Sequence, residues 1–234
     1  MKRAFPFLLV FLLALPAFGC ERLLEKAANQ GSVAAQVNLG AMYLEGMGVE
    51  QDYVKAKEWF EKAAAQGEAR AQTALGDMYR RGRGVEQDYS KAKELLEKAA
   101  NQGSHHAQTS LGEMYLEGEG VKQDYAKAKE LLEKAESQGA SLAQMFLGVI
   151  YLEGKGVKQD DVKAKEWIEK SAKKNLIAQA MLESMYFDGK SLKRNYAKDK
   201  ESFKKLCDDG KPHYAACYEY AKLVDRDKQK VANQ

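Results

Sequence analysis

The sequence lacks a strong excess of charge of either sign. It carries 37 Lys and Arg residues against 34 Asp and Glu, a formal net charge of +3. Two of the cationic residues, Lys2 and Arg3, belong to an N-terminal segment that we expect to be removed, so the remaining chain lies close to neutrality. Evenly mixed charges create no field of the kind that nucleic-acid binding requires. We therefore expect no nucleic-acid partner.

The sequence also lacks an apolar run long enough to span a membrane comfortably. The nearly unbroken apolar stretch from Ala4 to Phe18 is interrupted by Pro6 and Pro16, whereas a span needs about 20 residues. A basic start, a short apolar core and small residues near a cut site are typical of a secretory signal peptide. We predict a signal peptide at 1–19, with an uncleaved anchor as the alternative.

The cut site of this segment falls before a cysteine. Ala17-Phe18-Gly19 fits a small-x-small rule with cleavage before Cys20. A cysteine at that junction also resembles a bacterial lipoprotein signal, in which the cysteine becomes acylated. Such signals usually carry Leu and a small residue where this chain has Ala17 and Phe18, so the residues leave lipidation of Cys20 open. We expect an exported, periplasmic protein, whose only contact with a membrane would be this lipid.

Motifs for metal and nucleotide binding are missing as well. Neighbouring residues in a helix point about 100° apart, so His105 and His106 do not form a metal-binding i, i+4 pair. The third histidine, His213, lies far from them in the sequence. The segment Gly46-x-Gly48 lacks the third glycine of a phosphate-binding loop and follows a helical pattern rather than a strand. We expect no metal, no nucleotide and no other cofactor.

What the sequence does contain is a repeat with a period of about 36 residues. The first copy reads VAAQVNLGAMYLEGMGVEQDYVKAKEWFEKAAAQGE, and the second reads ARAQTALGDMYRRGRGVEQDYSKAKELLEKAANQGS. The copies lie at 33–68, 69–104, 105–140, 141–175 and, in degenerate form, 176–210. A second half-repeat at 21–32 precedes them, and a divergent cap at 211–234 follows. We predict one repeat domain over 20–234.

Each copy is predicted to form two helices. In the first copy, each helix has an apolar stripe. The stripe of the first helix is Ala35, Leu39, Met42 and Tyr43. The stripe of the second helix is Tyr53, Ala56, Trp59 or Phe60, and Ala63. Glycines at 46 and 48 end the first helix, and Asp52 can cap the second because its carboxylate can accept a first-turn N–H. Gly67 supplies a left-handed residue after the second helix, where the fourth copy has Asn175.

A single helix pair cannot bury these stripes, but stacked pairs can. Small residues such as Gly40 and Ala56 let helices approach closely, while Leu39 and Trp59 fill the space between them. The expected fold is all-α, an α/α superhelical solenoid of about five helix-turn-helix repeats with capping helices.

The pattern AQ-x-x-LG-x-x-Y-x-x-G-x-GV-x-x-D-Y-x-KA resembles the Sel1-like repeat family, relatives of tetratricopeptide repeats. The pattern is almost complete in the first four copies, and in the fourth copy Asp161 replaces its second tyrosine. The resemblance covers about 21–224. The fifth copy departs from it at Glu183, Ser191 and Asn195. The resemblance implies an α/α superhelix and an adaptor role, without naming the partner.

Cys207 and Cys217 are predicted to form a disulfide at the last helix junction. Cys207 lies near the end of one helix and Cys217 early in the next, and secreted cysteine-rich Sel1-like proteins look similar at this junction. Closing a loop of about 11 residues would stabilise the end of the solenoid by about 2.5–3 kcal/mol. Two unpaired thiols are the alternative. Pairing would leave Cys20 as the odd cysteine, which favours its acylation.

Some cysteine-rich Sel1-like proteins have been linked to β-lactam binding or hydrolysis, a chemistry that requires three sequence motifs. Ser90, Ser171 and Ser202 each have the Ser-x-x-Lys spacing, but Ser-Asp-Asn and Lys-Thr-Gly do not occur. We therefore expect no catalytic residues and a protein that is not an enzyme. Our main hypothesis is an envelope scaffold that binds a protein or peptide; the alternatives are an immunity-type inhibitor of an exported toxin and, third, a β-lactam-active protein.

Partner binding is expected where the copies diverge on the exposed side of their first helices. These positions are Ala34, Val37, Asn38 and Ala41; Arg70, Thr73, Ala74 and Asp77; His106, Thr109, Ser110 and Glu113; and Leu142, Met145, Phe146 and Val149. The last set is apolar throughout, and Ile177 and Met181 continue it. We predict that these six apolar residues bind the partner, with burial by neighbouring copies or the C-terminal helix as the alternative. Arg80, Arg81 and Arg83 form a basic cluster, which we expect to lie in a solvated loop.

Overall fold

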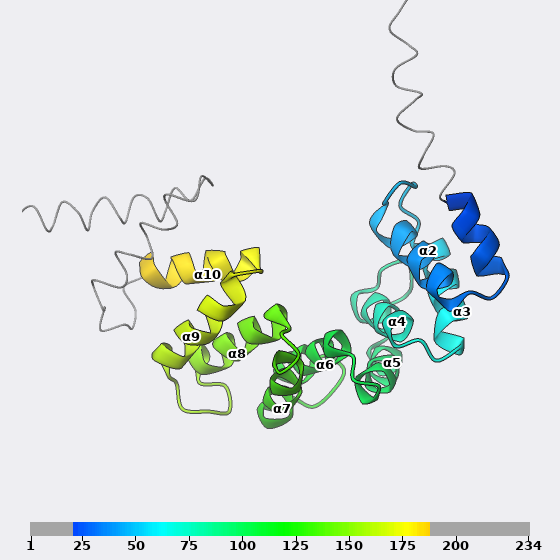
Figure 1. The fold of residues 1–234 in the computed structure, drawn as a ribbon. Helices are drawn as coiled ribbons and strands as arrows, with labels where there is room; N and C mark the ends of the chain where they lie inside the picture. The colour runs from blue at the N-terminus through cyan, green and yellow to red at the C-terminus, as the bar shows by residue number, and fades with distance from the viewer. Residues whose placement is uncertain (1–20, 188–234) are drawn as a thin grey trace, which may run out of the picture. The chain divides into compact units, whose positions relative to one another are not determined.

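The computed structural model describes residues 21–187, which are entirely helical in their regular structure (Figure 1). The chain divides into two compact units, 1–140 and 141–234, and each is described by itself. The all-α superhelical repeat fold predicted from the sequence is confirmed. That one continuous domain runs through both units stays a prediction.

The helices follow the repeat. The first unit has a helix at 21–29 and then α2 (Val33–Glu45), α3 (Tyr53–Ala65), α4 (Ala69–Arg81), α5 (Tyr89–Asn101), α6 (His105–Glu117) and α7 (Tyr125–Glu136). The second unit has α8 (Ser141–Glu153), α9 (Asp161–Ala172) and α10 (Leu176–Phe187). Each copy supplies one closely packed pair, α2 with α3, α4 with α5, α6 with α7, and α8 with α9. None of the helices within 21–187 is long and apolar enough to cross a membrane.

Local sequence sets where the helices begin and end. The Asp52 carboxylate accepts the backbone N–H groups of Val54 and Lys55, so it caps α3 as predicted. Gly46 adopts the left-handed conformation that ends α2, with φ of 70°. Asn175 has a role that the sequence did not suggest: its Oδ1 accepts the N–H groups of Ile177 and Ala178 and so caps α10.

The core forms where the first helix of a copy packs on the second. Leu39, Ala56, Phe60 and Ala63 are buried, as the predicted stripes require. A Cβ added at Gly40 would lie 2.6 Å from Cε1 of Phe60, so only glycine lets α2 approach α3 this closely. Leu96, Leu132 and Ile168 occupy the position of Phe60 in the next three copies, and all are buried.

Buried glutamines of the first helices form hydrogen bonds within their own copy and, at Gln36, to the preceding half-repeat. The side-chain amide of Gln36 donates to the carbonyl of Ala28 in the preceding half-repeat at 3.0 Å, and its Oε1 accepts from Gln66 at 2.8 Å. Gln72 and Gln108 accept equivalent bonds from Gln102 and Gln138. Because an unpaired buried amide is costly, these bonds hold each first helix against the end of the second helix of its own copy, and the bond from Gln36 to Ala28 also holds α2 against the preceding half-repeat.

A second link between repeats explains the second loop glycine of the pattern. Gly84 packs on Tyr53 of the preceding copy so closely that an added Cβ would lie 2.3 Å from the Tyr53 Cβ, and Gly120 packs on Tyr89 in the same way. In the fourth copy Asp161 stands where this tyrosine belongs, and in the fifth Ser191 stands where the glycine belongs. Ser191 lies outside the described residues, but the sequence loses both members of the contact together.

Candidate functional site: an arginine-lined groove

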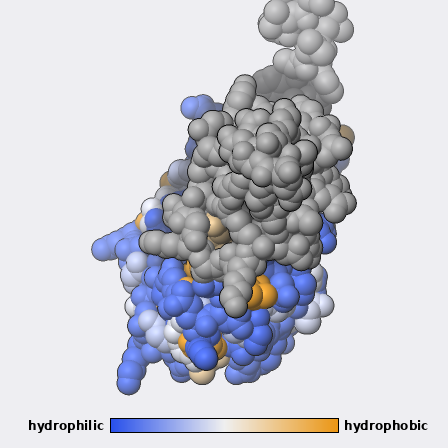
Figure 2. Space-filling view, turned by 90° about the vertical axis from the view of Figure 1, so that its left-hand side faces the viewer, coloured by the Kyte–Doolittle hydropathy of each residue, from blue (hydrophilic) through white to orange (hydrophobic). Residues whose placement is uncertain are grey.

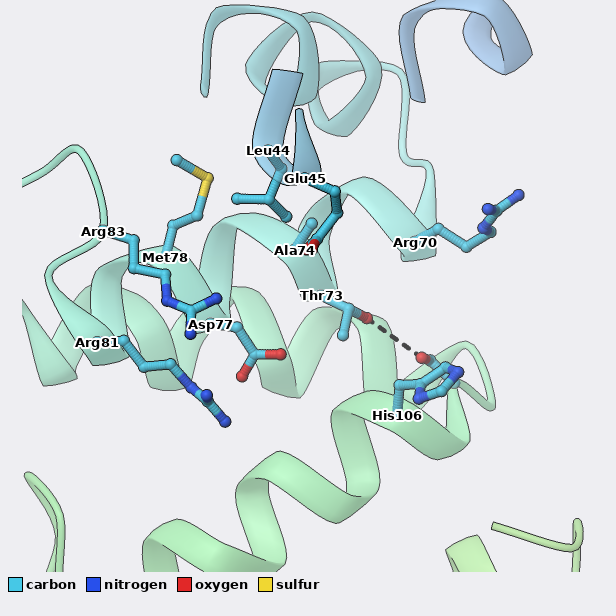
Figure 3. A pocket seen from close by; sticks show the side chains of 11 residues that line it. Leu44, Glu45, Arg70, Thr73, Ala74, Asp77, Met78, Arg81, Arg83 and His106 are labelled. Atoms are coloured by element: carbon cyan, nitrogen blue, oxygen red, sulfur yellow. Dashed lines mark hydrogen bonds between the residues drawn. The ribbon is translucent and has the colours of Figure 1, made fainter. Parts of the chain in front are cut away.

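A groove of about 520 Å³ lies on the first unit, where the end of α2, the length of α4 and the start of α6 meet (Figure 3). Its lining comprises Leu44, Glu45, Arg70, Thr73, Ala74, Asp77, Met78, Arg81, Arg83, Ser104 and His106. Five of these residues belong to the divergent first-helix positions that the sequence analysis selected for partner binding. The repeat fold therefore brings together residues from three copies.

The floor of the groove is buried and hydrogen-bonded. Met78 is buried beneath it, and Thr73 is nearly so. The Thr73 hydroxyl donates to the carbonyl of Ala69 at 2.7 Å and lies 3.2 Å from the Ser104 hydroxyl, which caps α6 (Figure 3). The expectation that Thr73 is exposed was wrong, because the N-terminus of α6 covers it, and the same expectation was wrong for Val37, Thr109 and Ser110, which are also buried.

Three exposed arginines line the groove. Arg81 and Arg83 lie at one end of it and Arg70 at the other, with Asp77 between them (Figure 3). None of the three forms an ion pair with another described residue. By contrast, many lysines of the second helices pair with a glutamate one turn away, such as Lys98 with Glu94 at 2.7 Å. The groove thus presents three guanidinium groups without an ion-pair partner among the described residues, alongside the carboxylates of Glu45 and Asp77.

Arg80 corrects the prediction of a solvated basic loop. Its side chain is only 4% exposed and forms ion pairs with Glu113 at 2.9 Å, Glu119 at 2.8 Å and Asp77 at 3.6 Å. Burial opposes its charge, but the Glu119 hydrogen bond and the charges of Glu113 and Asp77 outweigh that cost, so the pKa of Arg80 is raised. Only Arg81 and Arg83 of the cluster face solvent.

His106 lies at the start of α6, at the same end of the groove as Arg70 (Figure 3). Its ring centroid is 4.1 Å from that of His105. Partial burial, followed by the charge of His105, lowers the pKa of His106. Within residues 21–187, no group of three or more His, Cys, Asp or Glu side chains could hold a metal ion.

The apolar row predicted on the second unit is only partly at the surface. Met145 is 7% exposed and packs with Ile168, Ala172 and Ala178, so its predicted exposure was wrong. The physical reason is that α10 packs against this cluster and covers it. Phe146 and Met181 are partly buried against the same cluster, and Val149 is half-buried. Leu142 and Ile177 are 39% and 61% exposed and remain accessible.

One of the serines with β-lactamase-like spacing can be placed firmly. Ser171 is fully buried, and its hydroxyl donates to the carbonyl of Ser141 at 2.6 Å, so it is not an accessible nucleophile. Ser90 is exposed at the start of α5. Ser202, His213, Cys20, Cys207 and Cys217 lie outside the described residues, so the disulfide and the lipidation stay predictions.

Comparison of the copies contained a signal for the groove that the sequence analysis did not use. Arg80 occupies the position of Leu44 and Leu116, and the second of these is completely buried. An arginine aligned with leucines indicates a buried, paired charge rather than a loop residue. Figure 2 shows one face of the molecule, where the visible coloured surface is mostly hydrophilic and its hydrophobic areas are small and separate.

The comparisons with known proteins agree with this repeat architecture. The family model described as Sel1 repeat matches residues 20–32, 33–68, 69–104, 105–139, 141–176 and 177–198. No curated protein sequence matches the chain.

Solved structures give the same picture. A protective antigen from uropathogenic Escherichia coli is 34% identical over 87% of this chain, with a TM-score of 0.72, although the chain covers only 44% of that protein. A Sel1 repeat protein from Oxalobacter formigenes is 32% identical over 77% of this chain and 74% of its own, with a TM-score of 0.66. A Sel1 repeat protein from Klebsiella pneumoniae is 28% identical over 87% of this chain and 99% of its own length, with a TM-score of 0.60. The chain belongs to the Sel1 repeat family.

Proposed function

We propose that the protein is a protein-binding scaffold of the bacterial envelope. Sel1 repeat proteins generally mediate protein–protein interactions. The observation that supports a specific site is the groove on the first unit, because residues that differ between copies gather there while the core residues stay the same. A repeat scaffold acts by presenting such a surface, so the proposal requires no catalytic group.

Export of the protein is part of the proposal and depends on residues 1–19. Their basic start and short apolar core are typical of a secretory signal. The E. coli relative is described as a protective antigen, which is consistent with a protein that antibodies can reach. Intact-mass analysis of protein from its native envelope should show a chain that begins at Cys20, with or without added lipid. Recovery of the Met1 form from the cytoplasm would contradict export.

The scaffold proposal can be tested with a variant that takes its surface from another copy. The divergent residues of α4 are replaced by those at the same positions of α2, through Arg70→Ala, Thr73→Val, Ala74→Asn and Asp77→Ala. The first copy already carries these residues, so we expect the helical circular dichroism to be retained.

Crosslinked complexes are then purified from envelopes of cells that express the natural protein or the variant. We expect one partner protein to copurify with the natural protein and to be lost with the variant. The proposal fails if no protein is enriched with the natural chain, and the groove is the wrong surface if both chains retain the same partner.

A further inference from the structure

Arginine is concentrated in one copy of the repeat. The copies at 33–68, 105–140 and 141–175 contain no arginine, whereas 69–104 contains four. At the position of Arg81 the other copies have Glu45, Glu117 and Glu153. The fold therefore does not require a cation there, and the exposed arginines need another explanation.

The chemistry of the guanidinium group supplies that explanation. Arginine differs from lysine in holding several N–H donors in a planar fork that matches a carboxylate in two parallel hydrogen bonds. Arg70, Arg81 and Arg83 are exposed and form no ion pair with the other described residues. The Asp77 carboxylate already forms an ion pair with the buried Arg80, with 3.6 Å between Oδ1 of Asp77 and Nε of Arg80. The exposed arginines are therefore free to bind an anion in the groove.

The other lining residues narrow the identity of that anion. Leu44, Ala74 and Met78 add an apolar part to the groove, which suits an aliphatic side chain beside the anion. Glu45 and Asp77 line the groove too, and each can accept a hydrogen bond from a peptide N–H. The phosphodiester backbone of a nucleic acid has no such donor, so these two carboxylates only repel it, whereas the backbone N–H groups of a peptide offset their repulsion of its acidic side chains.

We infer that the groove binds an acidic segment of a partner protein, in which Asp or Glu residues meet Arg70, Arg81 and Arg83 while neighbouring aliphatic residues lie on the groove floor. This inference rests on the proposed scaffold function and names the chemistry of its partner. Electrostatic complementarity of this kind raises the association rate and gives specificity, and it weakens with salt.

The test uses a short fluorescein-labelled peptide in which glutamate alternates with leucine, and fluorescence anisotropy with the exported chain. The groove variant carries Arg70→Ala, Arg81→Glu and Arg83→Met, which are the residues of the first copy. The matched control is Lys155→Met, at the position of Arg83 in the fourth copy. We expect the peptide to bind the natural protein and the control, and the groove variant to bind at least about tenfold more weakly, a loss of about 1.4 kcal/mol.

Two further probes separate the alternatives. A peptide in which lysine alternates with leucine should not bind, and an oligothymidylate should bind more weakly than the acidic peptide. Equal binding of the acidic peptide to the natural protein and the groove variant, absence of its binding, or preference for the oligonucleotide would each overturn the inference. The scaffold proposal would survive any of these results if a partner is still captured from envelopes.

Discussion

The guanidinium of Arg80 lies 2.8 Å from a carboxylate oxygen of Glu119, which belongs to the next repeat. Its other terminal nitrogen lies 2.9 Å from Glu113 on α6. Leu44 and Leu116 fill the same position in the copies on either side. The second and third repeats are thus joined by a buried charge where the neighbouring copies use apolar packing.

Replacing Arg80 with the residue of the other copies should not weaken the fold. Replacing all the partners of a buried ion pair by apolar residues is often neutral or stabilising, by about 1–4 kcal/mol, whereas removing one partner costs about 3–5 kcal/mol where the remaining charge stays buried. The three carboxylates that lose their partner are partly exposed and can be hydrated again. We expect Arg80→Leu to unfold in urea at the same or a higher midpoint, and Arg80→Ala to lose about 2–4 kcal/mol through the cavity it leaves. A large loss for Arg80→Leu would show that the ion pairs themselves hold the two repeats together.

The contact between Gly84 and Tyr53 predicts a position where alanine is not tolerated. Gly67 and Gly84 both have positive φ, of 86° and 68°, but nothing lies within 4 Å of a Cβ at Gly67. Gly67→Ala should therefore lower the free energy of unfolding only by the strain of alanine in the left-handed conformation, about 1–2 kcal/mol. Gly84→Ala adds a clash with Tyr53 and should cost about 2–5 kcal/mol. Equal losses in chemical unfolding would mean that the two repeats can separate at this contact without cost.

The apolar row of the second unit should divide into core and surface residues. Phe146 packs against the cluster that contains Met145 and Ile168, so Phe146→Asp buries a charge and should lower the free energy of unfolding by about 2–4 kcal/mol. Ile177→Asp, at a residue that is 61% exposed, should change it by less than about 0.5 kcal/mol. Thermal unfolding followed by circular dichroism measures both. A stable Phe146→Asp protein would return Phe146 to the candidates for partner binding.

Tyr43 should ionise well above the usual pH for tyrosine. Burial, followed by its hydrogen bond to Glu21 at 2.9 Å, raises its pKa from 10.0 to about 12. Because the folded state favours the protonated phenol, the stability that this provides is complete below pH 10 and is lost as the pH rises towards 12. The difference in ultraviolet absorbance between the natural protein and Tyr43→Phe should report this titration. Glu21→Gln should lower the midpoint, and an ordinary midpoint in the natural protein would contradict the hydrogen bond.

The periodic features of the fold could be predicted from the sequence because each copy repeats the same local physics. Asp52 and its counterparts cap helices wherever they occur, and Leu39, Ala56 and Ala63 are buried as their spacing requires. Burial imposed by a neighbouring repeat could not be predicted from one helix at a time. Thr73 lies beneath the cap of α6, and Met145 lies in the cluster that α10 completes.

The groove could not be predicted from one helix at a time either. Arg70 and His106 were recognised as divergent residues, but nothing within either helix indicates that they line one groove with Arg81 and Arg83. Proximity in sequence groups Arg80 with Arg81 and Arg83, although its alignment with Leu116 indicates the buried position. Comparison of positions between copies, rather than along one copy, is the signal that separates them.

Photo-crosslinking in living cells tests most directly whether the partner binds in the groove. A photoreactive residue is placed at position 74, on the groove, and in a second protein at position 97, where the Glu97 side chain is 45% exposed on α5. We predict an adduct with a partner protein from position 74 and none from position 97. An adduct from position 97 alone, or equal adducts from both, would contradict the assignment of partner binding to this groove.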